Sequence, residues 1–267
     1  MSNIAWPPAD DAAVAKLMKD NGIQGVEVAP TRVWPDPVSR SRSEIQDYAV
    51  KWKRMGISIS SMQALLFGQP ELTVFQSKQQ RDLTLAYLKK MIRIAGLLGA
   101  GVLVFGSPKN RLGGNLPRAT VDDIAGEFFA ALGTCAQENG CVFCIEPNPV
   151  AYGCDFITTS EQALELVKDV NNPGFGLHLD SAAMVMSNED ITQSMALALP
   201  RLRHFHISEP QLAPVGAGGV DHTVFASTLK EFNYDKWCSI EMRETETDSN
   251  LQAISSALRY VSDLYQR

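Results

Sequence analysis

The chain has no long hydrophobic run and no long run of basic residues. No stretch approaches the roughly 18 consecutive apolar residues of a membrane-spanning helix. The opening residues, MSNIAWPPADD, contain neither the basic segment nor the apolar segment of an export signal. Lys and Arg number 24 against 30 Asp and Glu, and no basic run exceeds two residues. We therefore expect a soluble, cytoplasmic protein that binds neither a membrane nor a nucleic acid.

Cysteine is scarce as well, and so are the features of a disordered chain. The five Cys form an odd set without an export signal, which favours reduced thiols. Cys141 and Cys144 spell C-x-x-C, but they lie inside the apolar run CVFCIE and no second pair exists, so we interpret them as buried core thiols. With 45% apolar and 20% charged residues, the composition is that of a folded globular protein.

What the chain does contain is a regular alternation of strand-like and helix-like segments. The predicted strands are Asn3–Trp6, Gly25–Ala29, Ser58–Gln63, Gly101–Phe105, Val142–Glu146, Gly176–Asp180, Arg203–Ile207 and Cys238–Met242. The predicted helices are Asp11–Asn21, Glu44–Met55, Lys78–Leu98, Val121–Asn139, Ser160–Val170, Asp190–Leu199, Thr223–Phe232 and Leu251–Leu264. Eight pairs in 267 residues give about 33 residues per unit, which predicts one (β/α)8 TIM barrel over residues 1–267. An open doubly wound sheet is the alternative, but its Gly-rich phosphate motif is absent after the first strand.

Four consecutive predicted strands end in a residue type that binds metals. The sequences FCIEP, LHLDS, HFHIS and CSIEM place Glu146, Asp180, His206 and Glu241 at or near the strand ends. Their separations of 34, 26 and 35 residues are one βα unit each, so all four side chains can converge above the mouth of a barrel. Because alternate residues of a strand share a face, His178 and His204 should line the layer beneath them.

This residue set favours a single divalent cation. Three carboxylates and one imidazole suit Mn²⁺, Mg²⁺ or Co²⁺, whereas Zn²⁺ is less favoured because no cysteine joins the set. A single Glu or Asp after a barrel strand is often only a helix cap or a loop hydrogen-bonding group. Several carboxylates together would repel one another unless a cation neutralised them, and this favours the metal interpretation.

These motifs, in this order along nearly the whole chain, resemble those of the xylose isomerase-like TIM barrel superfamily of sugar and sugar-phosphate isomerases and epimerases. The resemblance places the family's glutamates at Glu146 in IEPNP and at Glu241 in SIE. It places the family's aspartate at Asp180 in HLDSAAM and the second histidine of its H-x-H motif at His206. For the ketose 3-epimerase branch, the resemblance implies that these four bind one divalent ion and that the two glutamates form the acid/base pair.

The chain also departs from its relatives. Ketose 3-epimerases carry a histidine where this chain has Ala183 and an arginine where it has Leu212, so their clamp on the substrate oxygens is missing. The superfamily's endonuclease branch holds three zinc ions with additional histidines, but this chain has only four histidines in total. Asp221 and His222 lie near the zinc ligands of that branch, and we expect them to cap a helix or to line the mouth.

Several loop residues are candidates for substrate contacts. Lys109 and Arg111 follow a strand in SPKNR and could clamp an anionic group, or they could be solvated loop cations. Trp6 and Trp34 follow the first two strands and could pack on a sugar face, or they could pack within the rim. We also count two histidines as candidate substrate contacts, namely His178 and His222.

We therefore expect a metal-dependent isomerase or epimerase that acts on a carbohydrate or polyol. The ion would stabilise an enediolate, while one glutamate removes a proton and the other returns it. One alternative is a keto-polyol dehydratase or lyase that shares the same intermediate. Another is a homologue that keeps the metal and binds ligands without turnover. The identity and phosphorylation of the substrate and the oligomeric state, including a homo-oligomer, stay open.

Overall fold

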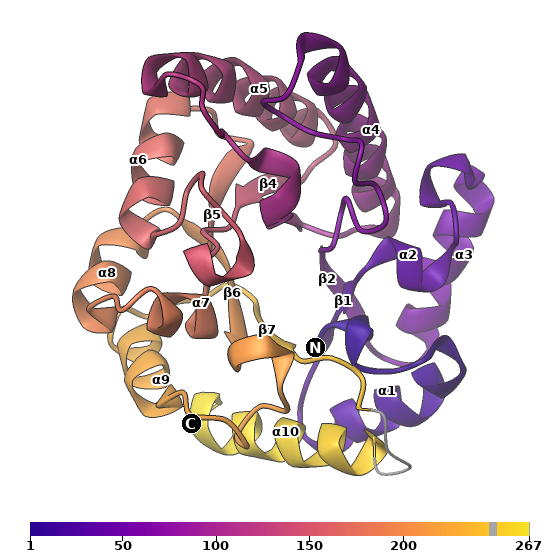
Figure 1. Cartoon of the computed structure of the whole chain (residues 1–267). Helices are drawn as coiled ribbons and strands as arrows, with labels where there is room; N and C mark the ends of the chain where they lie inside the picture. Colours follow the sequence, from indigo (N-terminus) through magenta and orange to yellow (C-terminus); the bar gives the residue numbers. More distant parts are fainter. Residues whose placement is uncertain (246–249, 267) are drawn as a thin grey trace.

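The computed structural model describes residues 1–245 and 250–266, and these residues form an α/β barrel (Figure 1). Seven parallel strands follow one another in chain order around the barrel, each hydrogen-bonded to the next. The helices between them cover its outside (Figure 1). The strands are β1 Gly25–Val28, β2 Ser58–Met62, β3 Val102–Phe105, β4 Val142–Ile145, β5 Phe175–Asp180, β6 Leu202–Ser208 and β7 Cys238–Glu241.

Eight longer helices lie close to the predicted ranges. They are α1 Asp11–Asp20, α3 Arg42–Arg54, α4 Lys78–Leu98, α5 Arg118–Glu138, α6 Ser160–Val170, α8 Ile191–Ala198, α9 His222–Glu231 and α10 Asn250–Tyr265. Two short helices are α2 Pro30–Val33 and α7 Ser181–Met186, and the 3-10 turns are η1 Asn3–Ala5, η2 Pro8–Asp10, η3 Pro37–Ser39, η4 Pro108–Arg111, η5 Val150–Tyr152 and η6 Pro210–Leu212. Among the described residues, no helix combines the length and the apolar character needed to cross a membrane.

The prediction of a strand at Asn3–Trp6 is wrong, and this segment contains the 3-10 turn η1. Pairing with the sheet is limited to a parallel bridge between Ser2 and Glu27, with the Ser2 N–H donating to the Ile240 carbonyl and the Met1 carbonyl accepting the Glu27 N–H, both at 2.9 Å. The Asn3 side chain accepts the Ala29 N–H at 2.7 Å, so a side chain takes the place of a continuing backbone ladder. Residues 1–2 thus close the gap between β1 and β7 that a full eighth strand would fill.

The two faces of the sheet have different chemistry. Toward the helices, aromatic rings pack together, with Phe129 of α5 against Phe105 and Phe175 at centroid distances of 6.0 and 5.0 Å. Inside the barrel, β3 and β4 contribute a small apolar cluster that includes Val104 and Cys144. The interior side chains of the other strands are polar, and they lead directly to the site described below.

Gly174, the residue before β5, lies so close to helix α5 that only glycine fits at this position. A Cβ at Gly174 would lie 2.0 Å from the carbonyl oxygen of Gly133, whereas a Cβ at Gly126 in the same helix would meet nothing within 4 Å. We expect Gly174→Ala to lower the free energy of unfolding by about 1–3 kcal/mol. Gly126→Ala should raise it by about 0.5–1 kcal/mol. Urea denaturation of both variants tests this contrast, and equal effects would contradict it.

Candidate metal and active site

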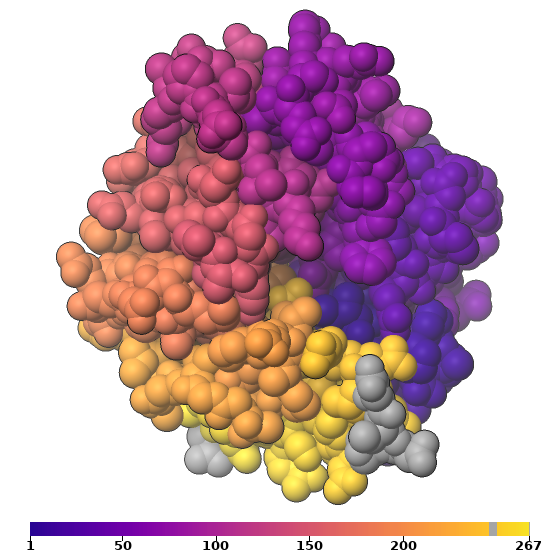
Figure 2. All heavy atoms as spheres, in the orientation of Figure 1, coloured from indigo at the N-terminus to yellow at the C-terminus, as the bar shows by residue number. Residues whose placement is uncertain are grey.

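The four predicted metal ligands meet at the mouth of the barrel. Glu146 directly follows β4, Asp180 and Glu241 end β5 and β7, and His206 lies two residues before the end of β6. One potential ligand atom from each residue lies within 4.8 Å of the others. The molecular surface is hollowed near the centre of this face, where early, middle and late parts of the chain meet (Figure 2).

The orientation of His206 suits a metal ligand. Its Nδ1 is 3.2 Å from Glu241 Oε2 and 3.9 Å from the nearest oxygens of Glu146 and Asp180. This buried nitrogen has no hydrogen-bond partner among the described residues, which is rare for a buried polar atom. Three carboxylates and one imidazole nitrogen are a donor set that fits a divalent ion such as Mn²⁺.

A fourth carboxylate, Glu27 of β1, lies beneath the site and was missed by the sequence analysis. It is fully buried, and its Oε2 is 2.9 Å from His206 Nε2. Burial alone would raise the pKa of Glu27, but the charge of His206 and hydrogen bonds from two histidines lower it well below its ordinary value. The one available signal was a single charge inside the apolar run GVEV. The other hydrogen-bonding partners of Glu27 are Ser61, Gln63, His204 and Ser239.

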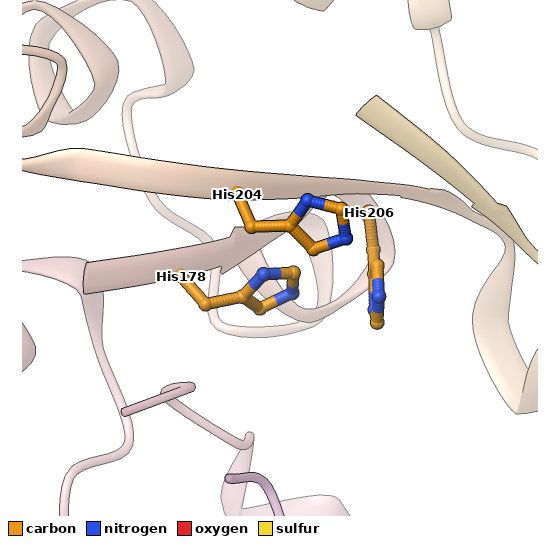
Figure 3. A group of neighbouring side chains, drawn as sticks. All are labelled: His178, His204 and His206. Atoms are coloured by element: carbon orange, nitrogen blue, oxygen red, sulfur yellow. The ribbon is translucent and has the colours of Figure 1, made fainter. Parts of the chain in front are cut away.

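His178 and His204, which strand alternation places on the same face as Asp180 and His206, are buried and lie close to the ring of His206 (Figure 3). The rings of His178 and His206 are 4.1 Å apart at 72°. Burial, together with the positive charge of His206, lowers the pKa of His178 well below its ordinary value. These rings and that of His204 form a second group of potential ligands, but Glu27 engages one nitrogen of each histidine on β6. The acidic group therefore offers the better metal site.

Without a bound cation, burial and mutual repulsion disfavour the charged forms of the carboxylates at the mouth. Burial is the main reason that the pKa of Glu146 rises to about 8, and the charges of Glu241 and Asp180 add to it. Burial and Glu241 likewise raise the pKa of Asp180 to about 6. Asp180 is held in place by the Ala183 N–H at 2.7 Å and the Ser208 hydroxyl at 2.6 Å. Bound positive charge would remove most of this cost.

A cavity of about 540 Å³ opens above the carboxylates. Ala183 and Leu212 line it, so the positions that differ from the ketose 3-epimerases do face the site. The rim loops are held in unusual backbone conformations, because four of the eight non-glycine residues with positive φ also line the cavity. The polar residues at this cavity that sequence analysis missed are Gln63, Ser107, Asn148, Tyr152, Ser208, Glu209, Gln211 and Arg243.

Comparison with known proteins identifies the family. Residues 15–264 match the family model described as the xylose isomerase-like TIM barrel. The chain belongs to this family. A ketose 3-epimerase from Arthrobacter globiformis is 31% identical over 84 residues, which are 32% of this chain and 29% of that protein. The match thus spans less than a third of the relative's length.

Solved structures of this xylose isomerase-like fold are similar over almost the whole chain. A D-psicose 3-epimerase superposes with a TM-score of 0.84 at 16% identity, covering 100% of this chain and 99% of the other. A 3-keto-D-glucoside 4-epimerase from E. coli gives 0.79 at 16% identity, with 98% of each chain covered. At such low identity, these similarities establish the shared fold.

Arg111 does not act as a substrate clamp in this xylose isomerase-like barrel, so that prediction is wrong. Its side chain is fully buried and donates to the carbonyls of Gly106 at 2.7 Å and Glu146 at 2.6 Å. It also donates to Asn148 Oδ1 at 3.1 Å and to the carbonyl of Phe156. Arg111 thereby connects the loops after β3 and β4.

Lys109, the other half of the predicted anion clamp, is exposed in η4. It lines a neighbouring cavity of about 480 Å³ and is not among the residues that line the cavity above the carboxylates. The side chains of Lys109 and Arg111 therefore do not converge on one group, although they lie only two residues apart. The pair cannot clamp an anion together.

Of the remaining predicted substrate contacts, His178 is buried beside the site, with Nε2 3.6 Å from Glu146 Oε1, whereas Trp6, Trp34 and His222 do not line the cavity above the carboxylates. Trp6 is buried, with Nε1 donating to Asp11 at 2.8 Å, and Trp34 packs against Tyr48 at a centroid distance of 5.3 Å. Both tryptophans pack within the rim. His222 is buried at the start of α9, 2.9 Å from the Tyr265 hydroxyl and 3.3 Å from Glu209 Oε1. As expected, Asp221 caps the same helix by accepting the Thr223 N–H at 3.0 Å.

Because the pKa of Glu146 is raised, we expect the free energy of unfolding of chelator-treated protein to depend on pH. A folded-state pKa of about 8, above the ordinary value of 4.5, means that stability is lost as pH rises between these values. Glu146→Gln cannot ionise, so it should be more stable than wild type by about 1–3 kcal/mol at pH 8.5 and similar at pH 4.5. Denaturation at both pH values measures this difference. The exposed Glu231→Gln is the control, and equal shifts in the two variants would contradict the assignment.

Proposed function

We propose that this protein is a divalent-metal-dependent isomerase or epimerase of a sugar or sugar phosphate. The observation that supports this most is the convergence of three carboxylates and the unpartnered Nδ1 of His206 within 4.8 Å, open to a cavity of about 540 Å³. Proton transfer next to a carbonyl needs an acid and a base beside a group that stabilises negative charge. The two glutamates can supply the acid and the base, and a divalent ion held by the four residues would supply the positive charge.

Glu146, Asp180, His206 and Glu241 would hold the ion. When bound, the ion polarises the carbonyl and a neighbouring hydroxyl of the substrate as a Lewis acid. Glu27 fixes the ring of His206 by accepting from Nε2, which leaves Nδ1 facing Glu241 at the mouth. Ser208 fixes Asp180 by donating its hydroxyl to Oδ2. Such outer contacts set the orientation and basicity of metal ligands.

The two glutamates are the proposed acid/base pair. They come from β4 and β7, which are not neighbours in the barrel, so they approach a substrate in the mouth from different sides. A pKa of about 8 in the metal-free site makes Glu146 able to hold a proton near neutral pH, and bound positive charge would lower that value. One glutamate, as carboxylate, takes the proton beside the carbonyl, and the other, already protonated, delivers a proton to the opposite face or to the adjacent carbon.

Substrate hydroxyls would be held by groups other than the missing histidine and arginine. Gln63, Asn148, Tyr152 and Arg243 line the cavity that Ala183 and Leu212 leave open. Tyr152 is positioned by the backbone N–H of Gln211, which donates to its hydroxyl at 3.0 Å. Arg243 follows Glu241 by two residues and provides a positively charged lining residue, a role that Arg111 does not fill.

One Mn²⁺ per chain is expected to bind through these four residues. Affinity should rise with pH from about 6 to above 8, because Asp180 and Glu146 must lose protons with pKa values near 6 and 8. His206, whose pKa is raised despite burial by the charges of Glu27 and Glu241, must also lose its Nδ1 proton. Asp180→Ala should weaken binding by about 100-fold or more, whereas the exposed Asp235→Ala should bind as wild type does. Calorimetry with Mn²⁺ at several pH values measures both effects. Two equivalents per chain, or undiminished binding in Asp180→Ala, would refute the site.

The proton-transfer role is tested by deuterium exchange. In D₂O, wild-type protein should incorporate deuterium next to the carbonyl of its substrate in a panel of ketoses and ketose phosphates that includes D-fructose and D-fructose 6-phosphate. Glu146→Gln and Glu241→Gln should each lower this rate by about 100- to 10,000-fold while still binding Mn²⁺, because an amide offers an oxygen but accepts no proton.

Three outcomes would contradict this assignment. Full exchange in either glutamine variant would show that another base acts. A product lighter by one water would indicate a dehydratase. Metal binding without exchange or product across the panel would favour a ligand-binding protein. Glu231→Gln, an exposed change on α9, is the matched control and should exchange at the wild-type rate.

A further inference from the structure

A second cavity continues the first one along the rim. Its volume is about 480 Å³, and Ala64, Ser107 and Pro108 line both cavities. The loop between β2 and α4 forms one wall of the second cavity, and η4 forms the other. Because the first cavity alone is within the usual size of a small-molecule site, the second offers room that a single sugar does not need.

The walls of the second cavity are fixed before any ligand arrives. Asn110 donates both of its side-chain hydrogens across the gap, to the carbonyls of Gln69 and Leu72 at 2.8 Å each. The N–H of Val74 returns a bond to the Asn110 carbonyl at 2.9 Å. The adjacent Arg111 connects η4 to the backbone of Glu146 at 2.6 Å, so both cavities share one rigid frame. A preformed site of this kind binds with little ordering cost.

An exposed aromatic ring lies on this frame. Phe67 is 70% exposed and lines the second cavity, on a turn in which its N–H donates to the Ala64 carbonyl at 3.1 Å. Proline side chains add apolar surface beside it, while Gln69 and Lys109 supply polar groups at the edge. An apolar face next to hydrogen-bonding groups matches a pyranose ring, whose C–H face stacks on aromatic rings while its hydroxyls stay hydrated.

We propose that the second cavity is a subsite for the second ring of a substrate larger than a monosaccharide: a keto-sugar with a glycosidically linked pyranose that stacks on Phe67. This inference rests on the proposed function, because the carboxylates define where the reacting ring lies. The shared lining residues make the two rings of one molecule the natural occupants of the two connected cavities.

The test compares binding of one ring with binding of two rings. D-fructose is compared with lactulose and isomaltulose, in which O4 or O6 of fructose carries a pyranose, by calorimetry on the full chain with Mn²⁺ present. At least one disaccharide should bind about 10-fold tighter than fructose. Phe67→Ala should remove this advantage and leave fructose binding unchanged. Phe232→Ala, which removes a 45% exposed ring at the end of α9, should behave as wild type does.

Each other outcome has a defined meaning. Fructose binding as tightly as both disaccharides, no binding of either disaccharide, or equal losses for both sugar classes in Phe67→Ala would overturn the subsite. Light scattering is measured in parallel, and a dimer that dissociates only in Phe67→Ala would also overturn it, because the ring would then be an interface residue. If no deuterium exchange occurs with any sugar but the Phe67-dependent preference persists, the proposed function fails and the subsite stands.

Discussion

The buried carboxylate of Glu27 is the constraint on which the interior of the barrel depends. A carboxylate without solvent must be satisfied by partners, and its partners come from β2, from β6, from β7 and from the residue that follows β2. It therefore joins the first strand to the last ones across the place where the backbone ladder is reduced to a bridge at Ser2. Because it occupies Nε2 of His206, the other ring nitrogen points to the mouth.

The buried polar side chains inside the barrel lower the stability of the fold, and the apolar packing around β3 and β4 compensates for this loss. Val102, Val104 and Cys144 fill the barrel beside β3 and β4 with ordinary core packing, and aromatic rings pack outside the same strands. The strands β5 to β7 instead carry the three imidazoles and two carboxylates, Asp180 and Glu241, while Glu27 lies on β1 and Glu146 directly follows β4. The unfavourable desolvation of these groups is greatest around the mouth, where a bound cation would compensate for it.

Much of the fold and the convergence of the candidate ligands could be predicted because both follow from spacing. Helices end near Gly22, Gly56, Gly99 and Gly140, which adopt positive φ, and a candidate ligand at or near the strand end repeats with the βα unit. Side-chain direction in loops follows from tertiary contacts instead. In the sequence, Arg111 has the position of a loop cation, but in the structure backbone carbonyls hold its side chain. Glu27 is only a single charge in a strand until its partners on distant strands are known. The segment Asn3–Trp6 has strand composition, yet the Asn3 side chain ends the pairing.

The hydrogen bonds of the neighbouring residues Asn110 and Arg111 divide the rim into a part that they hold in place and a part that they do not hold. Their contacts hold the base of the loop between β2 and α4 and the backbone at Glu146. Among the described residues, the tip of this loop, residues 64–68, has no hydrogen bond to the four candidate ligands, and a Cβ at Gly68 would meet nothing within 4 Å. The length or sequence of the tip can therefore change without moving those four side chains. Under the proposed function, the range of molecules that the cavities accept and the chemistry at the carboxylates can evolve, or be engineered, separately.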